Sequence, residues 1–152
     1  MKRATIAELI AMLFVIIFLY TGISKWLDYY VFRETLSAAP LIQPISKFLA
    51  IAVPGTEILA SVLLFLPKTR LLGLFTSLLL VTIFTGYIVY ILAANDKLPC
   101  SCGGVLQQLS WTQHLFFNFT LMILASTAIK LSQADHLQFT TKKQVINPKA
   151  VS

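Results

Sequence analysis

Long apolar runs alternate with short polar stretches along most of the chain. Four of these runs are long enough to cross a bilayer as helices, and we place them at about residues 5–23, 48–66, 71–94 and 111–130. Backbone groups in lipid must be satisfied within the segment itself, which favours helices. The pattern predicts an all-α fold, a four-helix transmembrane bundle formed by residues 1–131.

The connection between the first two runs, residues 24–47, is mixed in character. Trp26 and Tyr29 suit a membrane interface, where aromatic rings anchor among the headgroups. Pro40 and Pro44 interrupt any single helix in this stretch. We therefore predict a short interfacial helix between helices 1 and 2, then a break and a second short helical lead-in.

Helix starts are indicated by two capping-box patterns, Thr5 with Glu8 and Ser110 with Gln113. They predict that the first helix begins near Thr5 and that the fourth opens at Trp111. Glu8 is interpreted as a cap only. The fourth span is expected to end near Lys130, and the polar tail at 132–152 is expected to be weakly ordered and cytoplasmic.

The basic start of the chain, Lys2 and Arg3, followed by an apolar run, also fits a cleaved signal peptide. No small-x-small cleavage site follows closely, since the next residues are Ile23-Ser24-Lys25-Trp26. We therefore favour a retained first span.

Composition supports a membrane protein. The chain is 57% hydrophobic and 12% charged, whereas soluble domains carry about 25% charged residues. A soluble protein of this size could not hide so much apolar surface, so membrane lipid is the expected surrounding. The net charge is +6, but the basic residues are scattered through short loops and the tail, and we expect no nucleic-acid partner.

The distribution of basic residues predicts the topology. An even number of spans places both termini on one side, and that side holds most of the lysines and arginines. By the positive-inside rule this side is cytoplasmic. We therefore predict a multi-pass protein whose loop between the third and fourth spans faces outward, toward the periplasm or the cell exterior. The location we predict is a bacterial inner membrane with this loop in the periplasm.

That loop carries Cys100 and Cys102, the only two cysteines of the chain, followed by Gly103 and Gly104. We favour a redox-active dithiol, because a disulfide across so small a ring is expected to be strained and reducible. An inert structural disulfide fits less well, since it would remove little unfolded-state entropy. A copper or zinc site is the third alternative, but with His114 the only nearby imidazole the ligands fall short of a closed zinc set. We expect no metal.

Glu57 is the one acid inside the second apolar run, and we place it in the outer half of that helix. Carboxylates inside spans usually face the bundle interior. Glu57 is a candidate proton donor or acceptor for thiol chemistry. The alternative, which we rate slightly ahead, is a structural pair with Lys25 or a hydrogen bond to a tyrosine or asparagine. Lys25 itself is otherwise expected to snorkel to the interface.

Two polar residues open the fourth span. His114 is a candidate proton shuttle near the thiols, although a plain interfacial histidine is the simpler interpretation. Asn118 lies one turn further along the same face and is expected to make an interhelical hydrogen bond. In the third span, residues 85–87 could line a cavity for a quinone or a lipid, or serve as ordinary packing groups.

Several motifs together resemble a known family. The Gly22-x-x-Lys25-x-x-Asp28 end of the first helix is similar to DoxX-like membrane proteins. Three further motifs, in the same four-span order, together resemble those of the MauE family: Pro54-Gly55-x-Glu57, Pro67-x-x-Arg70 with Gly73, and Cys100-x-Cys102-Gly103-Gly104.

The resemblance implies a four-helix membrane bundle associated with periplasmic redox work. MauE itself serves the maturation or export of the methylamine dehydrogenase small subunit, alongside a thioredoxin-like partner. By matching position, Cys100 and Cys102 are the candidate redox pair and Glu57 the candidate intramembrane acid. The substrate is not carried over. With a single cysteine pair, electrons would pass directly to a membrane carrier, for which a quinone is the candidate cofactor, or to another protein.

Two hypotheses follow. In the first, the chain is a redox accessory protein, a component of a thiol-disulfide oxidoreductase, whose Cys100/Cys102 pair exchanges disulfides with a periplasmic thioredoxin-like protein. In the second, it is a non-enzymatic membrane subunit or small-molecule carrier. Glu57 would then line a polar cavity with Lys25 or His114, and the cysteines would be incidental.

Overall fold

The computed structural model describes residues 2–94 and 110–146, and every element in these ranges is helical. Four helices are long and apolar enough to cross a membrane: α1 (Lys2–Leu27), α3 (Ser46–Phe65), α4 (Arg70–Ala94) and α5 (Trp111–Ile146). The predicted all-α fold with four spans is confirmed.

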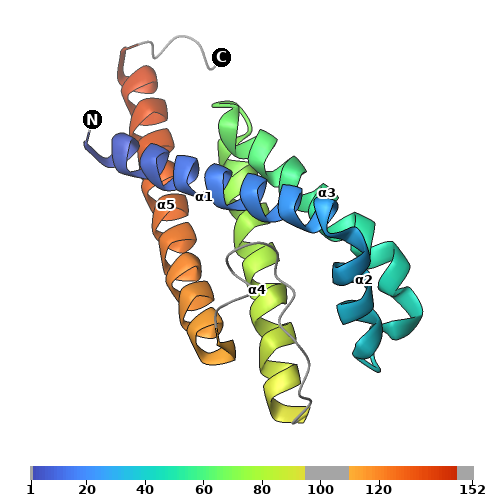
Figure 1. Cartoon of the computed structure of the whole chain (residues 1–152). Helices are drawn as coiled ribbons and strands as arrows, with labels where there is room; N and C mark the ends of the chain where they lie inside the picture. The colour runs from blue at the N-terminus through green and yellow to red at the C-terminus, as the bar shows by residue number, and fades with distance from the viewer. Residues whose placement is uncertain (1, 95–109, 147–152) are drawn as a thin grey trace.

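The four long helices pack as two pairs that cross each other (Figure 1). Helix α1 runs along α3, and α4 runs along α5; α1 also packs against α5, and α3 against α4. The start of α1, the turn between α3 and α4, and the last turns of α5 lie together, and we call this the terminal end. The opposite end, where α4 stops and α5 starts, is called the loop end.

A short helical segment joins α1 to α3 at the loop end, as predicted. It consists of α2 (Tyr29–Ala38) and a 3₁₀ turn, η1 (Gln43–Ile45), that contains Pro44. Helix α2 folds back onto α3, where Phe32 and Leu36 are buried against Ala50. This segment therefore closes one side of the bundle at the loop end.

The interior of the bundle toward the terminal end is densely packed. Phe14, Leu64 and Leu74 are fully buried there, between small residues such as Ala11 and Ala125. Small residues let helices approach closely. The van der Waals contacts made at close approach are a main source of attraction between helices in lipid. Many large apolar side chains instead point outward, as expected for a surface that faces acyl chains: Leu9, Ile16, Leu27, Phe116 and Ile123.

Helix boundaries agree with the sequence in one case and differ in two. The capping box at the start of α5 is confirmed, because the Ser110 amide donates to Gln113 Oε1 at 3.0 Å and the Gln113 amide to Ser110 Oγ at 3.3 Å. Helix α1, however, begins at Lys2 rather than near Thr5. The cap role predicted for Glu8 is therefore wrong: Glu8 lies inside α1, and Arg70 Nη2 donates to its Oε1 at 3.1 Å across the terminal end.

The second difference concerns the tail, which was expected to be weakly ordered beyond Lys130. Helix α5 instead continues to Ile146. No glycine or proline occurs between Leu131 and Ile146, so nothing in this stretch breaks the helix.

Candidate functional site

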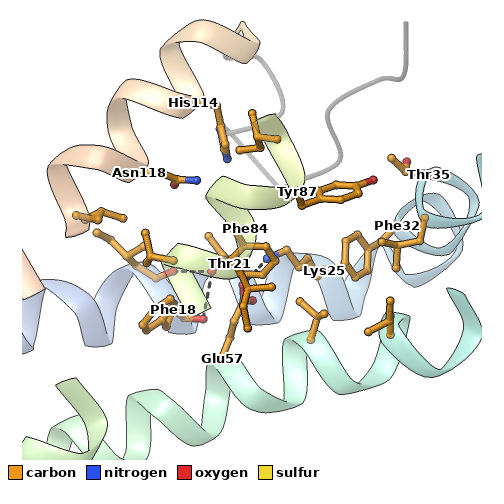
Figure 2. A pocket seen from close by; sticks show the side chains of 18 of the residues that line it. Phe18, Thr21, Lys25, Phe32, Thr35, Glu57, Phe84, Tyr87, His114 and Asn118 are labelled. Carbon is orange, nitrogen blue, oxygen red and sulfur yellow. Dashed lines mark hydrogen bonds and ion pairs between the residues drawn. The ribbon is translucent and has the colours of Figure 1, made fainter. Parts of the chain in front are cut away.

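A cavity of about 180 Å³ lies between the two helix pairs, and α2 closes part of its wall. Its walls are mostly apolar. Its polar residues come from all four spans and from α2: Thr21 and Lys25 from α1, Thr35 from α2, Glu57 from α3, Tyr87 from α4, and His114 and Asn118 from α5 (Figure 2).

A buried ion pair forms the polar centre of this cavity. The Lys25 ammonium donates to Glu57 Oε1, and the two residues are only 4% and 1% exposed. Glu57 lies near the middle of α3 rather than in its outer half, which corrects the depth predicted from the sequence. The predicted structural pairing of Glu57 with Lys25 is confirmed, and the expectation that Lys25 snorkels to the interface is wrong.

The pair forms because α1 and α3 approach closely at Gly22. A Cβ atom at this position would lie 3.2 Å from Ile58 Cγ1 and 3.3 Å from the Pro54 carbonyl oxygen. A larger residue would therefore push α1 away from α3. Gly22 thus sets the spacing at which the Lys25 side chain, one turn further along α1, can reach Glu57.

Aromatic rings surround the ammonium group. Lys25 Nζ lies 4.8 Å from the centre of the Phe84 ring and 5.7 Å from that of Phe32. Ring faces attract a cation at these distances, most strongly where water is excluded. The two rings therefore help to hold a charge that would otherwise be costly at this depth.

Two buried polar side chains of α5 point into the same cavity without satisfying their hydrogen-bonding groups. His114 is 5% exposed and Asn118 is 6% exposed. His114 Nδ1 and Asn118 Nδ2 have no hydrogen-bond partner among the described residues. Buried polar groups are usually satisfied, so these two atoms mark a place where a bound molecule or water would be stabilised.

These positions bear on two expectations. His114 is buried against the cavity rather than exposed at the interface. The amide nitrogen of Asn118 makes no interhelical hydrogen bond within the described ranges. In the third span, Tyr87 lines the cavity, whereas Thr85 donates to the Val81 carbonyl within its own helix at 2.7 Å.

Of the four residues proposed for chemistry, the structure brings Glu57 and His114 to one cavity. Cys100 and Cys102 lie outside the described residues. The described ranges hold no group of three or more His, Cys, Asp and Glu side chains that could bind a metal ion. Glu57 and His114 thus face a common space, with Glu57 paired with Lys25.

The sequence reasoning missed Phe84 and Phe32. Phe84 and Ile88 are one turn apart on α4 with Tyr87 beside them, and all three line the cavity. Their spacing indicated a common helix face, but the span is apolar all round, so nothing in it distinguished the inward face. Phe32 reaches Lys25 only because α2 folds back toward the bundle.

Comparison with known proteins gives one match. The family described as methylamine utilisation protein MauE matches residues 3–131, which include the first three spans and most of the fourth, Thr112–Ala134. No curated protein and no solved structure matches the chain.

Proposed function

Because the chain belongs to the MauE family, we propose that it is a redox-associated accessory protein of the membrane, in which Cys100 and Cys102 exchange disulfides with a thioredoxin-like partner. The partner acts on the periplasmic side of a bacterial inner membrane, where disulfides persist. The family description refers to methylamine utilisation. We propose thiol exchange for this chain and do not assign it methylamine dehydrogenase or any other protein as a substrate.

The exchange proceeds in two balanced steps. A thiolate of one protein attacks a sulfur of the other protein's disulfide, so that one S–S bond forms, another breaks, and a mixed disulfide and a new thiolate result. The remaining thiolate of the attacking pair then displaces the partner. One pair ends as a dithiol and the other as a disulfide, and two electrons have passed between them.

The proposal is supported above all by where the two cysteines occur in the chain. They belong to the segment that connects α4 to α5, and these two helices contribute Phe84, Tyr87, His114 and Asn118 to the cavity. The thiols are thus tethered by short connections to the helix ends nearest the buried polar groups. Glu57 and His114 are suited to take up or release the protons that accompany thiol oxidation.

Single-cysteine variants test this proposal. Cys100→Ala and Cys102→Ala each remove the group that would resolve a mixed disulfide, so at least one of them should accumulate a covalent complex in cells. The complex should be visible on a non-reducing gel and should disappear on reduction. The double variant serves as the matched control and should form no complex. If neither single variant traps any protein, thiol exchange is not the function.

A second candidate function, a small-molecule carrier or non-enzymatic subunit, is favoured by the cavity itself. Lys25, Glu57 and His114 line one space, which is the arrangement that this hypothesis requires. Substitution separates the two functions. If Cys100→Ser with Cys102→Ser leaves function intact while Glu57→Gln removes it, the carrier is correct, and the opposite result supports thiol exchange.

A further inference from the structure

We infer that the cavity between the helix pairs binds the head group of a membrane quinone, a neutral six-membered ring with carbonyl oxygens. This inference rests on the proposed function, in which a single cysteine pair passes its electrons to a membrane carrier or to another protein; a quinone is a carrier of the first kind. The size, charge and hydrogen-bonding groups of the cavity fit such a ring.

The size of the cavity fits a single ring. Its volume is about 180 Å³, and an apolar cavity of roughly 150 Å³ inside a protein holds one benzene molecule. Drug-sized ligands occupy pockets of about 300–1,000 Å³. A substituted single ring therefore fits, with any long isoprenoid tail extending outside toward the lipid.

The charges favour a neutral ligand. Lys25 is already paired with Glu57, so the polar centre carries no net charge from these two residues. An anionic or cationic ligand would bring an uncompensated charge into a low-dielectric space, which is costly. A quinone is neutral in both its oxidised and its fully reduced forms.

The unsatisfied nitrogens of α5 favour a ligand that carries oxygens, and Glu57 Oε2, which is also unsatisfied, can accept from the hydroxyl of the reduced, quinol form. Asn118 Nδ2 is a buried donor without an acceptor among the described residues, and His114 Nδ1 is a second unsatisfied nitrogen on the same helix. A quinone carbonyl can accept from the amide, and the ammonium of Lys25 on α1 offers donors from another side (Figure 2). A lipid acyl chain would leave these groups unsatisfied.

The aromatic side chains complete the fit. Phe32, Phe84 and Tyr87 line the cavity from α2 and α4, while Lys25, Glu57, His114 and Asn118 lie on α1, α3 and α5 (Figure 2). Flat rings pack well against aromatic side chains. When bound, a quinone accepts two electrons and two protons to become a quinol, and a dithiol supplies both as its two S–H bonds give way to one S–S bond; the reverse direction balances equally.

The test uses photo-crosslinking of the full chain in lipid nanodiscs with a short-chain azido-benzoquinone, followed by mass spectrometry of the labelled peptides. Labelling should be saturable, should be displaced by unmodified short-chain benzoquinone, and should map to the cavity-lining residues of α4 and α5. Labelling that is not displaced, or that spreads over lipid-facing residues such as Phe116 and Ile123, would overturn the inference. Displacement by a fatty acid as effectively as by the quinone would identify an acyl-chain site and would also overturn it.

Two variants test the cavity in different ways. Val53→Phe fills the space without changing a polar group and should abolish saturable labelling. Asn118→Leu keeps the shape but removes the donor, and should weaken binding about tenfold, as the loss of one buried hydrogen bond predicts. The matched controls are Phe75→Ala on α4 and Thr120→Val on α5, both exposed positions, which should bind like the wild type.

The cysteine variant separates this inference from the proposed function. Cys100→Ser with Cys102→Ser should retain saturable quinone labelling, since the inference rests on cavity groups of the described helices and on neither thiol. Trapped mixed disulfides without quinone labelling would refute the quinone site and leave thiol exchange standing. Quinone labelling without any trapped complex would support the quinone site and refute thiol exchange.

Discussion

The two ends of the bundle are packed differently. Toward the terminal end, the helices meet through Ala11, Phe14, Leu64 and Leu74, all at most 1% exposed and all apolar. Toward the loop end, the same helices separate around a cavity that contains a buried ion pair and two polar side chains of α5. The first region has the features of a scaffold, and the second those of a binding site.

This difference is informative because both regions lie within membrane-spanning helices. Lipid tails are as apolar as leucine, so the hydrophobic effect favours neither arrangement, and close packing supplies the stability of the terminal end. Buried polar groups at the loop end are costly for the stability of the bundle, and such groups inside a membrane usually serve a function. The variants below measure the contrast in order of decreasing effect on stability.

The largest effect is expected when one partner of the buried ion pair is removed. Lys25→Met leaves the Glu57 carboxylate buried without its counter-charge, and the free energy of unfolding in detergent should fall by about 3–5 kcal/mol. Adding Glu57→Leu should restore most of the loss, since a matched apolar pair has no charge to compensate.

The matched control for this variant is the ion pair at the terminal end. Glu8 is about half exposed there, at 52% for its side chain, so Arg70→Met should cost no more than about 1 kcal/mol. Equal losses for Lys25→Met and Arg70→Met would show that burial does not raise the cost of breaking an ion pair in this bundle. Failure of the double variant to recover stability would show that packing, not charge, dominates at Lys25.

A smaller effect is expected from closing the tightest contact in the packed region. A Cβ at Gly73 would lie 2.7 Å from the Leu64 amide nitrogen and 3.0 Å from the Leu63 carbonyl carbon, so Gly73→Ala must separate α4 from α3. We expect a loss of about 1–3 kcal/mol in unfolding experiments. Gly86→Ala on the same helix meets nothing within 4 Å and should be neutral or slightly stabilising. Equal effects at both positions would refute the close approach.

The smallest effect should have the opposite sign. Asn118→Leu removes a buried amide nitrogen that has no partner in the described part of the chain, and should raise the free energy of unfolding by up to about 1 kcal/mol. Thr120→Val, exposed on the same helix, should change it by less than about 0.5 kcal/mol. A clear destabilisation by Asn118→Leu would mean that the amide supports the fold rather than a ligand.

Much of the fold could be predicted because it depends on patterns that are local in sequence. Apolar runs of sufficient length, two prolines and the Ser110–Gln113 box were enough to place the spans, the interfacial segment and the start of α5. The extension of α5 to Ile146 was not predicted, because the polar composition beyond Lys130 is typical of weakly ordered tails. The same stretch contains no helix breaker, and this allows the helix to continue.

The site could be predicted only in part. Glu57 was identified because an acid in an apolar run is conspicuous, and Lys25 was among its proposed partners. The convergence of Phe32, Phe84, His114 and Asn118 depends on how α2 folds back and how the helix pairs cross, and periodicity does not encode either feature. An apolar helix such as α4 shows no preferred face, so its inward residues remained hidden.

The most direct test of the account measures the redox state of Cys100 and Cys102 in intact cells with a membrane-impermeant thiol reagent. We predict labelling only after mild reduction, and a shift in the oxidised fraction when the oxidant supply of the cell is changed. That result would mean a cycling disulfide on the outer face. A pair that labels freely at all times would contradict the disulfide, and a pair that stays unlabelled after reduction would contradict the outward position of the loop.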